Sequence, residues 1–391
     1  MGWREVSVSD ERLEFVRLAL EEGANRRELC RRFGVSPKAG YKWLARWLGG
    51  DEALADRSRR PHASPQRSAP AIEAKVLEVR QAHPAWGARK IESALTRAGV
   101  VMPAISTVHE ILRRHDQIDP KSPSANRATR RFEMPAPNRA WQMDYKGWVT
   151  LRGGERCHPL TIVDDHSRFA PCLKACADQT SKTVQGHLET TFARYGLPDA
   201  IFVDNGSPWS DAGGERWTML SVWLLKLGVQ VWRSRPYHPQ SRGKNERFHR
   251  TLKAEVFAMN RFSTFEEVQH AFDRWRDIYN YERPHEALDQ QPPSSRYRTS
   301  SRRMPAQLPT VSYEPSEIVR KVSSTKAYVS FKGRLWKVPQ AFRGERLAIR
   351  QVKRDGSYGV FFGSQKVADI DLSTAEAVTH VSEQVLPMSP G

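Results

Sequence analysis

Three carboxylates of this sequence lie where acidic side chains are rare or isolated. Asp144 falls inside the stretch 141–145, which has apolar residues at alternate positions and is typical of a strand, although Asp is depleted in strand interiors. Asp204 directly follows the apolar run 200–203, and Glu246 lies in a predicted helix among cationic residues. Oxygen ligands of this kind suit Mg²⁺ or Mn²⁺. Two such ions about 3.5–4 Å apart can activate an attacking oxygen and steady a leaving oxygen in phosphoryl transfer.

Asp204 and Glu246 each also have a purely structural explanation. The stretch 204–206, Asp-Asn-Gly, is typical of a hairpin turn, although residues 207–210 do not continue as a strand. Glu246 has five cationic neighbours, so the alternative there is a solvated basic helix with one balancing charge. Asp164 and Asp165 are rival ligands, and we expect them instead to end a strand near the site.

The stretch 135–297 has the element pattern of an α/β domain. Three strands are followed by alternating helices and strands, which predicts a sheet with helices on both faces. In such sheets, sites form at the carboxyl ends of the strands. The predicted strands are 141–145, 158–164, 167–171, 200–203 and 229–232, and the predicted helices include 181–195, 213–227 and 264–281.

The helix that carries Glu246 follows a loop with several helix-breaking residues, 235–243. Glu246 lies off the apolar row of this helix, roughly 200° from its first member at about 100° per residue. The row is predicted to face a core and consists of Phe248, Leu252, Val256 and Met259.

The composition favours a polyanionic partner. The chain of 391 residues has 62 Lys and Arg against 44 Asp and Glu, a net charge of +18, which suits nucleic acid or an anionic membrane surface. No apolar run is long enough to span a bilayer, and the N-terminus lacks the apolar region of a signal peptide. A soluble, cytoplasmic protein is therefore expected. The four cysteines form no pair of metal-binding knuckles, and disulfides are not expected.

Residues 1–50 and 69–115 each predict three short helices. In the first segment, Asn25 and Ser36 are suitable N-caps, and Gly34 supplies the turn between the last two helices. This pattern is that of a DNA-binding helix-turn-helix domain, with a plain helical hairpin as the alternative. The second segment repeats the design, and two such domains in tandem suit a long, specific DNA site.

The other segments are predicted to be linkers and one small domain. Basic linkers occupy 51–68 and 116–134, where cations outnumber apolar residues. A further linker spans 298–317. Short strands with hairpin-type turns over 318–372 predict a small C-terminal β-barrel, and 373–391 is a tail.

Cationic and aromatic side chains on these segments are the expected DNA contacts. In the N-terminal half they are Lys38, Tyr41, Lys42, Arg46, Arg59, Arg60, Arg89, Lys90, Arg130 and Arg131. Around Glu246 they are Lys244, Arg247, Arg250 and Lys253. The loop 235–243 is expected to form a mobile lip over the DNA.

Three motifs, in order, resemble the catalytic core of insertion-sequence DDE transposases, which is of the retroviral-integrase type. They are Trp141–Tyr145, Val203–Gly206 and Tyr237–Arg247, and the stretch Tyr279–His285 resembles the end of that core. The N-terminal pair of helix-turn-helix segments is also similar to bacterial members. The resemblance implies a multidomain protein with an α/β ribonuclease-H-like core.

The resemblance also implies the chemistry. Asp144, Asp204 and Glu246 correspond to the family's catalytic triad and metal ligands, with two Mg²⁺ or Mn²⁺ ions per site, and Lys253 corresponds to a basic residue two turns after the Glu. Members bind the terminal inverted repeats of a mobile element, cleave to free 3′-OH ends and join these to target DNA. The expected partners are double-stranded DNA and at least one further copy of the chain, in the bacterial cytoplasm at the nucleoid.

Two departures from the family pattern stand out. The interval from Asp204 to Glu246 is longer than the commonest one, and the stretch 210–216 can hold the extra residues. Helix-turn-helix segments also replace the zinc-binding N-terminal module of retroviral integrases. A domesticated DNA-binding protein that does not cut, or a structure-specific nuclease of the same fold, remains the alternative function.

Overall fold

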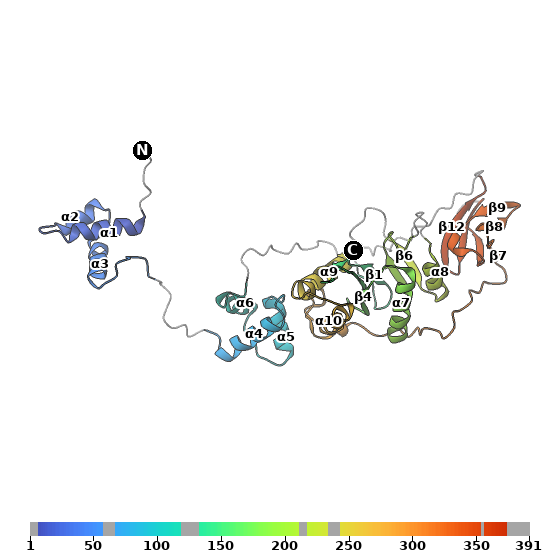
Figure 1. The fold of residues 1–391 in the computed structure, drawn as a ribbon, viewed down its shortest axis with the longest axis horizontal. Coiled ribbons are helices and arrows are strands. Elements are labelled where there is room, and N and C mark those ends of the chain that lie inside the picture. Colours follow the sequence, from blue (N-terminus) through green and yellow to red (C-terminus); the bar gives the residue numbers. More distant parts are fainter. Residues whose placement is uncertain are drawn as a thin grey trace. The chain divides into compact units, whose positions relative to one another are not determined.

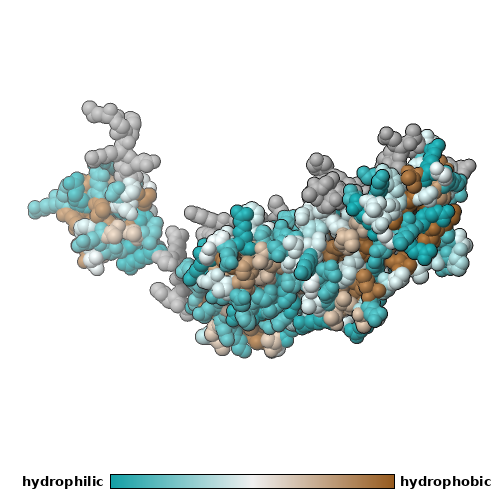
Figure 2. Space-filling model, turned by 45° about the vertical axis from the view of Figure 1, so that its right-hand side comes forward, coloured by the Kyte–Doolittle hydropathy of each residue, from teal (hydrophilic) through white to brown (hydrophobic). Residues whose placement is uncertain are grey.

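The computed structural model describes residues 7–57, 67–118, 133–210, 217–233, 243–352 and 356–373 (Figure 1). The chain divides into two compact units, Met1–Arg67 and Ser68–Gly391, and each has its own core. Hydrophilic side chains cover much of the face drawn in Figure 2, with smaller hydrophobic patches between them. Within the described residues, no helix combines the length and the apolar character needed to cross a membrane.

The first unit contains the three predicted helices, α1 (Val8–Ala19), α2 (Arg26–Arg32) and α3 (Pro37–Leu48). The caps are the predicted ones: Asn25 accepts from the backbone of Glu28, and Ser36 accepts from that of Ala39. Gly34 makes the turn at a φ of +64°, a conformation that favours glycine. The helices close over a small apolar core formed by Phe15, Val16, Ala19, Cys30, Trp43, Leu44 and Leu54.

The second unit opens with another three-helix group, again as predicted: α4 (Pro70–Ala82), α5 (Ala88–Arg97) and α6 (Ile105–Arg114). Its core is formed by Val76, Trp86, Ile91, Leu95, Val108, Ile111 and Leu112. The buried carboxylate of Glu73 on α4 is bonded by Arg114 and His115 at the end of α6. A buried charge needs such partners, so this pair also fixes the helix ends.

A six-stranded mixed sheet follows. Its strands are β1 (Trp141–Tyr145), β2 (Val149–Thr150), β3 (Arg156–Asp164), β4 (Cys172–Cys176), β5 (Ala200–Val203) and β6 (Gln230–Arg233). The order is β2-β3-β1-β5-β6, and β4 pairs with β3. The pairs β1–β3 and β3–β4 are antiparallel, whereas β1–β5 and β5–β6 are parallel.

Helices cover both faces of this sheet, as predicted (Figure 1). On one face, α7 (Ser181–Tyr195) and α8 (Met219–Lys226) pack against alternate strand residues such as Met143 and Ile162. On the other, α9 (Gly243–Leu252) and α10 (Phe265–Asp277) pack against the intervening ones, such as Val163. Successive strand side chains point to opposite faces, so one strand contributes to both cores.

The strand predicted at 167–171 was misplaced. In the structure β3 ends at Asp164, residues 165–167 form a turn, and β4 begins after Pro171. Arg168 has a φ of +64°, which a strand does not accept, and Pro171 cannot donate a ladder hydrogen bond.

The apolar row on the helix of Glu246 was only partly correct. Phe248, Leu252 and Val256 are buried, but Met259 is 55% exposed. The regular helix ends at Leu252, and a π-helical turn over Lys253–Phe257 follows it. A π-turn contains more residues than an α-turn, so it rotates the following residues out of the α-helical register.

The C-terminal strands are β7 (Ile318–Lys321), β8 (Tyr328–Phe331), β9 (Arg334–Lys337), β10 (Arg346–Gln351), β11 (Ser357–Phe362) and β12 (Gln365–Asp371). The predicted barrel is not confirmed, because the described strands form two open sheets, β12-β11-β10-β7 and the hairpin β8–β9. The hairpin places Val329, Phe331 and Trp336 in the same core as the larger sheet. Burying this apolar face stabilises the domain without closure of the hydrogen-bond ladder.

Candidate active site

The backbones of Asp144 and Asp204 come together at the carboxyl ends of two neighbouring strands. β1 and β5 are parallel, with Trp141 opposite Ile201 and Gln142 opposite Phe202. Continuing the same pairing by two residues places Asp144 opposite Asp204. Neighbouring strands of a sheet lie about 4.8 Å apart. Sites in α/β folds form at such strand ends.

The turn after Asp204 is not a hairpin turn. β5 runs parallel to both of its neighbours, β1 and β6, so residues 204–206 do not reverse the chain into a paired strand. The carboxylate of Asp204 accepts a hydrogen bond from the Gly206 amide at 2.9 Å. Arg233 at the end of β6 donates to the main-chain oxygens of Asp204 and Trp209, at 3.2 and 2.7 Å. These contacts hold the Asp204 turn against the ends of β5 and β6.

Glu246 lies in the first turn of α9, which packs against β1 and β3. Asn245 and Phe248 point into the protein, whereas the side chain of Glu246 is 74% exposed, with Arg250 3.9 Å away. Among the described residues, no three His, Cys, Asp or Glu side chains are grouped closely enough to hold a metal ion. Asp144, Asp204 and Glu246 are carboxylates, and like charges at short distance repel one another. Their oxygen chemistry suits Mg²⁺, and the strand register supplies two of the three positions.

Asp165 holds the first turn of α9 in place. The Nζ atom of Lys244 lies 2.5 Å from Oδ2 of Asp165, and burial lowers the pKa of Lys244 to about 8. The buried carboxylate of Asp165 also accepts from the Met134 amide at 2.8 Å and from Gln142 Nε2 at 2.7 Å. The contact between Lys244 and Asp165 therefore joins α9 to β1 through Gln142.

Asp164 ends β3, as expected, and its carboxylate organises the turn after it. It accepts from the amide and hydroxyl of Ser167, at 2.8 and 2.6 Å, and from the amide of Asn138. Burial raises the pKa of Asp164 despite these bonds. Ser167 and Asn138 belong to the turn after β3 and the segment before β1, so these contacts give Asp164 a supporting place beside the site.

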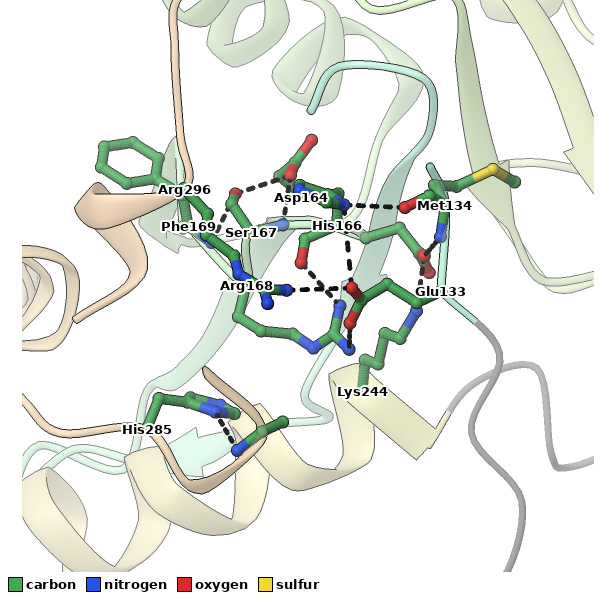
Figure 3. A network of polar contacts seen from close by, with 12 residues as sticks. Glu133, Met134, Asp164, His166, Ser167, Arg168, Phe169, Lys244, His285 and Arg296 are labelled. Atoms are coloured by element: carbon green, nitrogen blue, oxygen red, sulfur yellow. Dashed lines mark hydrogen bonds and ion pairs between the residues drawn. The ribbon is translucent and has the colours of Figure 1, made fainter. Parts of the chain in front are cut away.

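Glu133, in the segment before β1, lies close to three basic side chains. It bonds Arg168 at 2.6 Å and Arg296 at 3.1 Å, and His166 lies 3.7 Å away. Figure 3 shows these side chains together, with Lys244 reaching toward them from α9. Glu133 thus connects the segment before β1 with the turn after β3 and with the chain near Arg296, beside the first turn of α9.

The predicted DNA contacts of α3 fall into two groups. Lys38 and Lys42 are exposed, and the ring of Tyr41 is 46% exposed. The side chain of Arg46, by contrast, is 11% exposed, forms an ion pair with Asp51 and lies over Trp43. Lys38, Tyr41 and Lys42 therefore reach solvent from one helix, whereas Arg46 bonds to other residues of the first unit.

The predicted contacts of the second unit also differ in exposure. Arg89 is exposed and lies 3.8 Å from Glu286, which Arg247 approaches at 3.3 Å. Lys90 is half-buried, and burial lowers its pKa to about 8. On α9 and the turn after it, Arg250 and Lys253 are exposed, whereas the side chain of Lys244 is only 15% exposed. Arg59, Arg60, Arg130 and Arg131, and the loop 235–242, lie outside the described residues.

Sequence reasoning missed the polar residues that connect the carboxylate-bearing elements. Gln142, Thr161 and Glu133 bond to residues from 17 to 163 positions away in the sequence. The available signal was local: Gln142 and Thr161 are polar residues inside apolar strands, as Asp144 is. A buried polar side chain needs a partner, but its position in a strand does not reveal which one.

Family models account for most of the chain. Two integrase core domain models match residues 134–239 and 227–293. The C-terminal domain of IS481 family transposases matches 317–378. A helix-turn-helix domain matches 11–62, and a homeodomain-like domain matches 39–112.

Individual relatives agree with these matches. The insertion element IS476 protein of Xanthomonas euvesicatoria is 24% identical over 60% of this chain and 68% of its own length. The insertion element IS407 protein of Burkholderia multivorans is 27% identical over 41% of this chain, which spans about half (55%) of that relative. A chain of a simian T-cell lymphotropic virus intasome structure is 17% identical over 75% of this chain and 99% of its own, with a TM-score of 0.36. This chain therefore carries an integrase core domain, helix-turn-helix domains and the C-terminal domain of IS481 family transposases, and it is similar to proteins of bacterial insertion elements.

Proposed function

We propose that this chain binds the terminal inverted repeats of a mobile DNA element, cleaves to free 3′-OH ends and joins them to target DNA. The observation that carries the proposal is the strand register that brings Asp144 level with Asp204, next to the helix whose first turn contains Glu246. Carboxylates from two strand ends and one helix are a donor set for divalent-metal phosphoryl transfer.

Asp144, Asp204 and Glu246 are proposed to hold two Mg²⁺ or Mn²⁺ ions. When bound, such a pair activates the attacking oxygen and steadies the leaving one. Water and then the freed 3′-OH would be the successive nucleophiles, so no Ser or Tyr nucleophile of the chain is needed. The chain's own task is to place these carboxylates and to hold the DNA backbone beside them.

DNA binding is proposed to be shared among the domains. Exposed cations of α3 and α5 would bind the element ends, together with the Lys and Arg residues in the sequence of the linkers 51–68 and 116–134. Arg247, Arg250 and Lys253 would hold the backbone near the cut. Lys244 was predicted in the same role, but its contact with buried Asp165 favours a structural one. Two ends must be joined in one event, so a complex of at least two copies is proposed.

The test is cleavage and joining with the element's own ends. Purified protein would be incubated with labelled end DNA and a plasmid target, with Mg²⁺ or with a chelator. Mg²⁺-dependent release of 3′-OH ends and their insertion into the plasmid are expected. Binding without cleavage in Mg²⁺ would instead identify a non-cutting DNA-binding protein, and cleavage without joining a nuclease.

A further inference from the structure

We propose that Thr161 and His249 are positioning residues that fix the helix of Glu246 relative to the strand of Asp144. The inference rests on the proposed function, because it concerns how those two carboxylates are spaced. It assigns a role to two residues that lie outside the predicted triad and DNA contacts.

Thr161 lies opposite Asp144, on the neighbouring strand β3, and is fully buried. Its Oγ1 atom donates to the main-chain oxygen of Asp144 at 2.9 Å. The same Oγ1 lies 2.8 Å from Nε2 of His249 on α9. A threonine hydroxyl has one proton, and Asp144 receives it, so Nε2 of His249 must carry a proton and donate it to Thr161.

A second connection joins the same two elements one turn earlier. Lys244 contacts Asp165, and Asp165 accepts from Gln142 of β1. Gln142 and Asp144 are two residues apart, so they lie on the same face of β1. On α9 the two attachment points, Lys244 and His249, lie on either side of Glu246. The helix is therefore fastened to β1 before and after the residue that it presents.

Polar connections add something that the apolar contacts of α9 do not. Phe248 and Leu252 are buried against the sheet, but apolar contact is non-directional and tolerates small rotations of the helix. Hydrogen bonds weaken steeply when their angle changes, so the two connections restrict rotation. The side chain of Glu246 is 74% exposed, and rotation of α9 would move its carboxylate farther than its backbone. Metal sites require ligands held within about 0.5 Å.

The experiment compares Thr161→Val with Thr161→Ser in the full-length protein. Valine keeps the shape and removes the hydroxyl, and serine restores the hydroxyl. We expect Thr161→Val to raise the Mg²⁺ concentration for half-maximal cleavage about tenfold and Thr161→Ser to return it to within about threefold of wild type. Mn²⁺ stabilisation against thermal unfolding, read without DNA, should shift to higher Mn²⁺ in the same order.

Thr191→Val is the matched control. Thr191 is also buried, and its Oγ1 donates to the main-chain oxygen of His187 on α7, a helix of the opposite face. Thr191→Val should lower the free energy of unfolding by an amount comparable to Thr161→Val. It should leave the Mg²⁺ concentration for half-maximal cleavage and the Mn²⁺ concentration for stabilisation unchanged. If Thr161→Val does not fold, His249→Phe and His249→Gln repeat the comparison at a half-buried position, since glutamine can still donate.

An unchanged Mg²⁺ and Mn²⁺ requirement in Thr161→Val, or an equal shift in Thr191→Val, would overturn the positioning role. A failure of the proposed function would give a different result from a failure of the positioning role. In that case the wild-type protein itself would show no metal-dependent cleavage, whatever the variants do.

Discussion

The ammonium of Lys244 and the carboxylate of Asp165 are in contact inside the protein, with side-chain exposures of 15% and 2%. Removal of one partner leaves an uncompensated buried charge, which costs about 3–5 kcal/mol. Lys244→Met is therefore expected to lower the free energy of unfolding of the second unit by about that amount. Chemical denaturation measures it. Arg250→Met, at an exposed ion pair on the same helix, should cost less than about 1 kcal/mol, and equal losses would argue against the buried pair.

Lys90 should make stability depend on pH. Burial is the largest cause that lowers its folded-state pKa to about 8, from an ordinary value of 10.5. Between these values the unfolded chain binds more protons, so the contribution of Lys90 makes the folded state more stable as the pH rises from about 8 to about 10.5. Lys90→Met should remove this rise, and Lys75→Met, at an exposed position of α4, should retain it. Denaturation midpoints at pH 7.5 and 10 provide the measurement, and identical profiles for wild type and Lys90→Met would contradict the assignment.

Lys42 and Arg46 of α3 should respond differently to truncation. Lys42 is exposed, so Lys42→Ala is expected to weaken binding to element ends. It should also make the slope of log K against log salt concentration less steep by about one. Arg46 pairs with Asp51 and also donates to the main-chain oxygen of Ala55. Arg46→Ala should therefore lower the melting temperature of residues 1–67. Filter binding across a salt series and thermal unfolding separate the two effects, and an unchanged melting temperature for Arg46→Ala would refute this division.

Lys253 is expected to act near the cut rather than in end recognition. It is exposed in the turn that follows the helix of Glu246. Lys253→Ala should reduce strand transfer about tenfold while end binding changes less than about twofold. Lys182→Ala, at an exposed lysine of α7, is the control and should change neither. Proportional losses of transfer and binding would indicate a general electrostatic role for Lys253.

The sequence was sufficient for the elements that carry the three carboxylates. Apolar runs over 141–145 and 200–203 predicted β1 and β5 to the residue, and helical spacing placed Phe248 and Leu252 toward a core. These features are local, because burial on a sheet face or a helix stripe leaves a period in the sequence. The pairing of β1 with β5, which brings Asp144 level with Asp204, was not predicted, because the residue pattern of a strand does not specify its neighbours in the sheet.

Other features depend on contacts that leave no local pattern. Lys244 resembled its cationic neighbours, and nothing near it in the sequence indicated that Asp165 would bury it. The π-turn that exposes Met259 interrupts the 3.6-residue period without a proline or glycine to signal it. The β8–β9 hairpin was predicted as part of a barrel, since strand lengths and turns do not specify whether two sheets join or pack face to face.

The central claim is that Asp144, Asp204 and Glu246 act together in metal-dependent strand transfer. The most direct measurement compares Asp144→Asn, Asp204→Asn and Glu246→Gln with wild type on the element's ends in Mg²⁺, with end binding measured in parallel. Each variant should lose cleavage and joining by at least about a thousandfold and bind the ends within about threefold of wild type. Near-normal strand transfer by any one of the three, with end binding intact, would contradict the account.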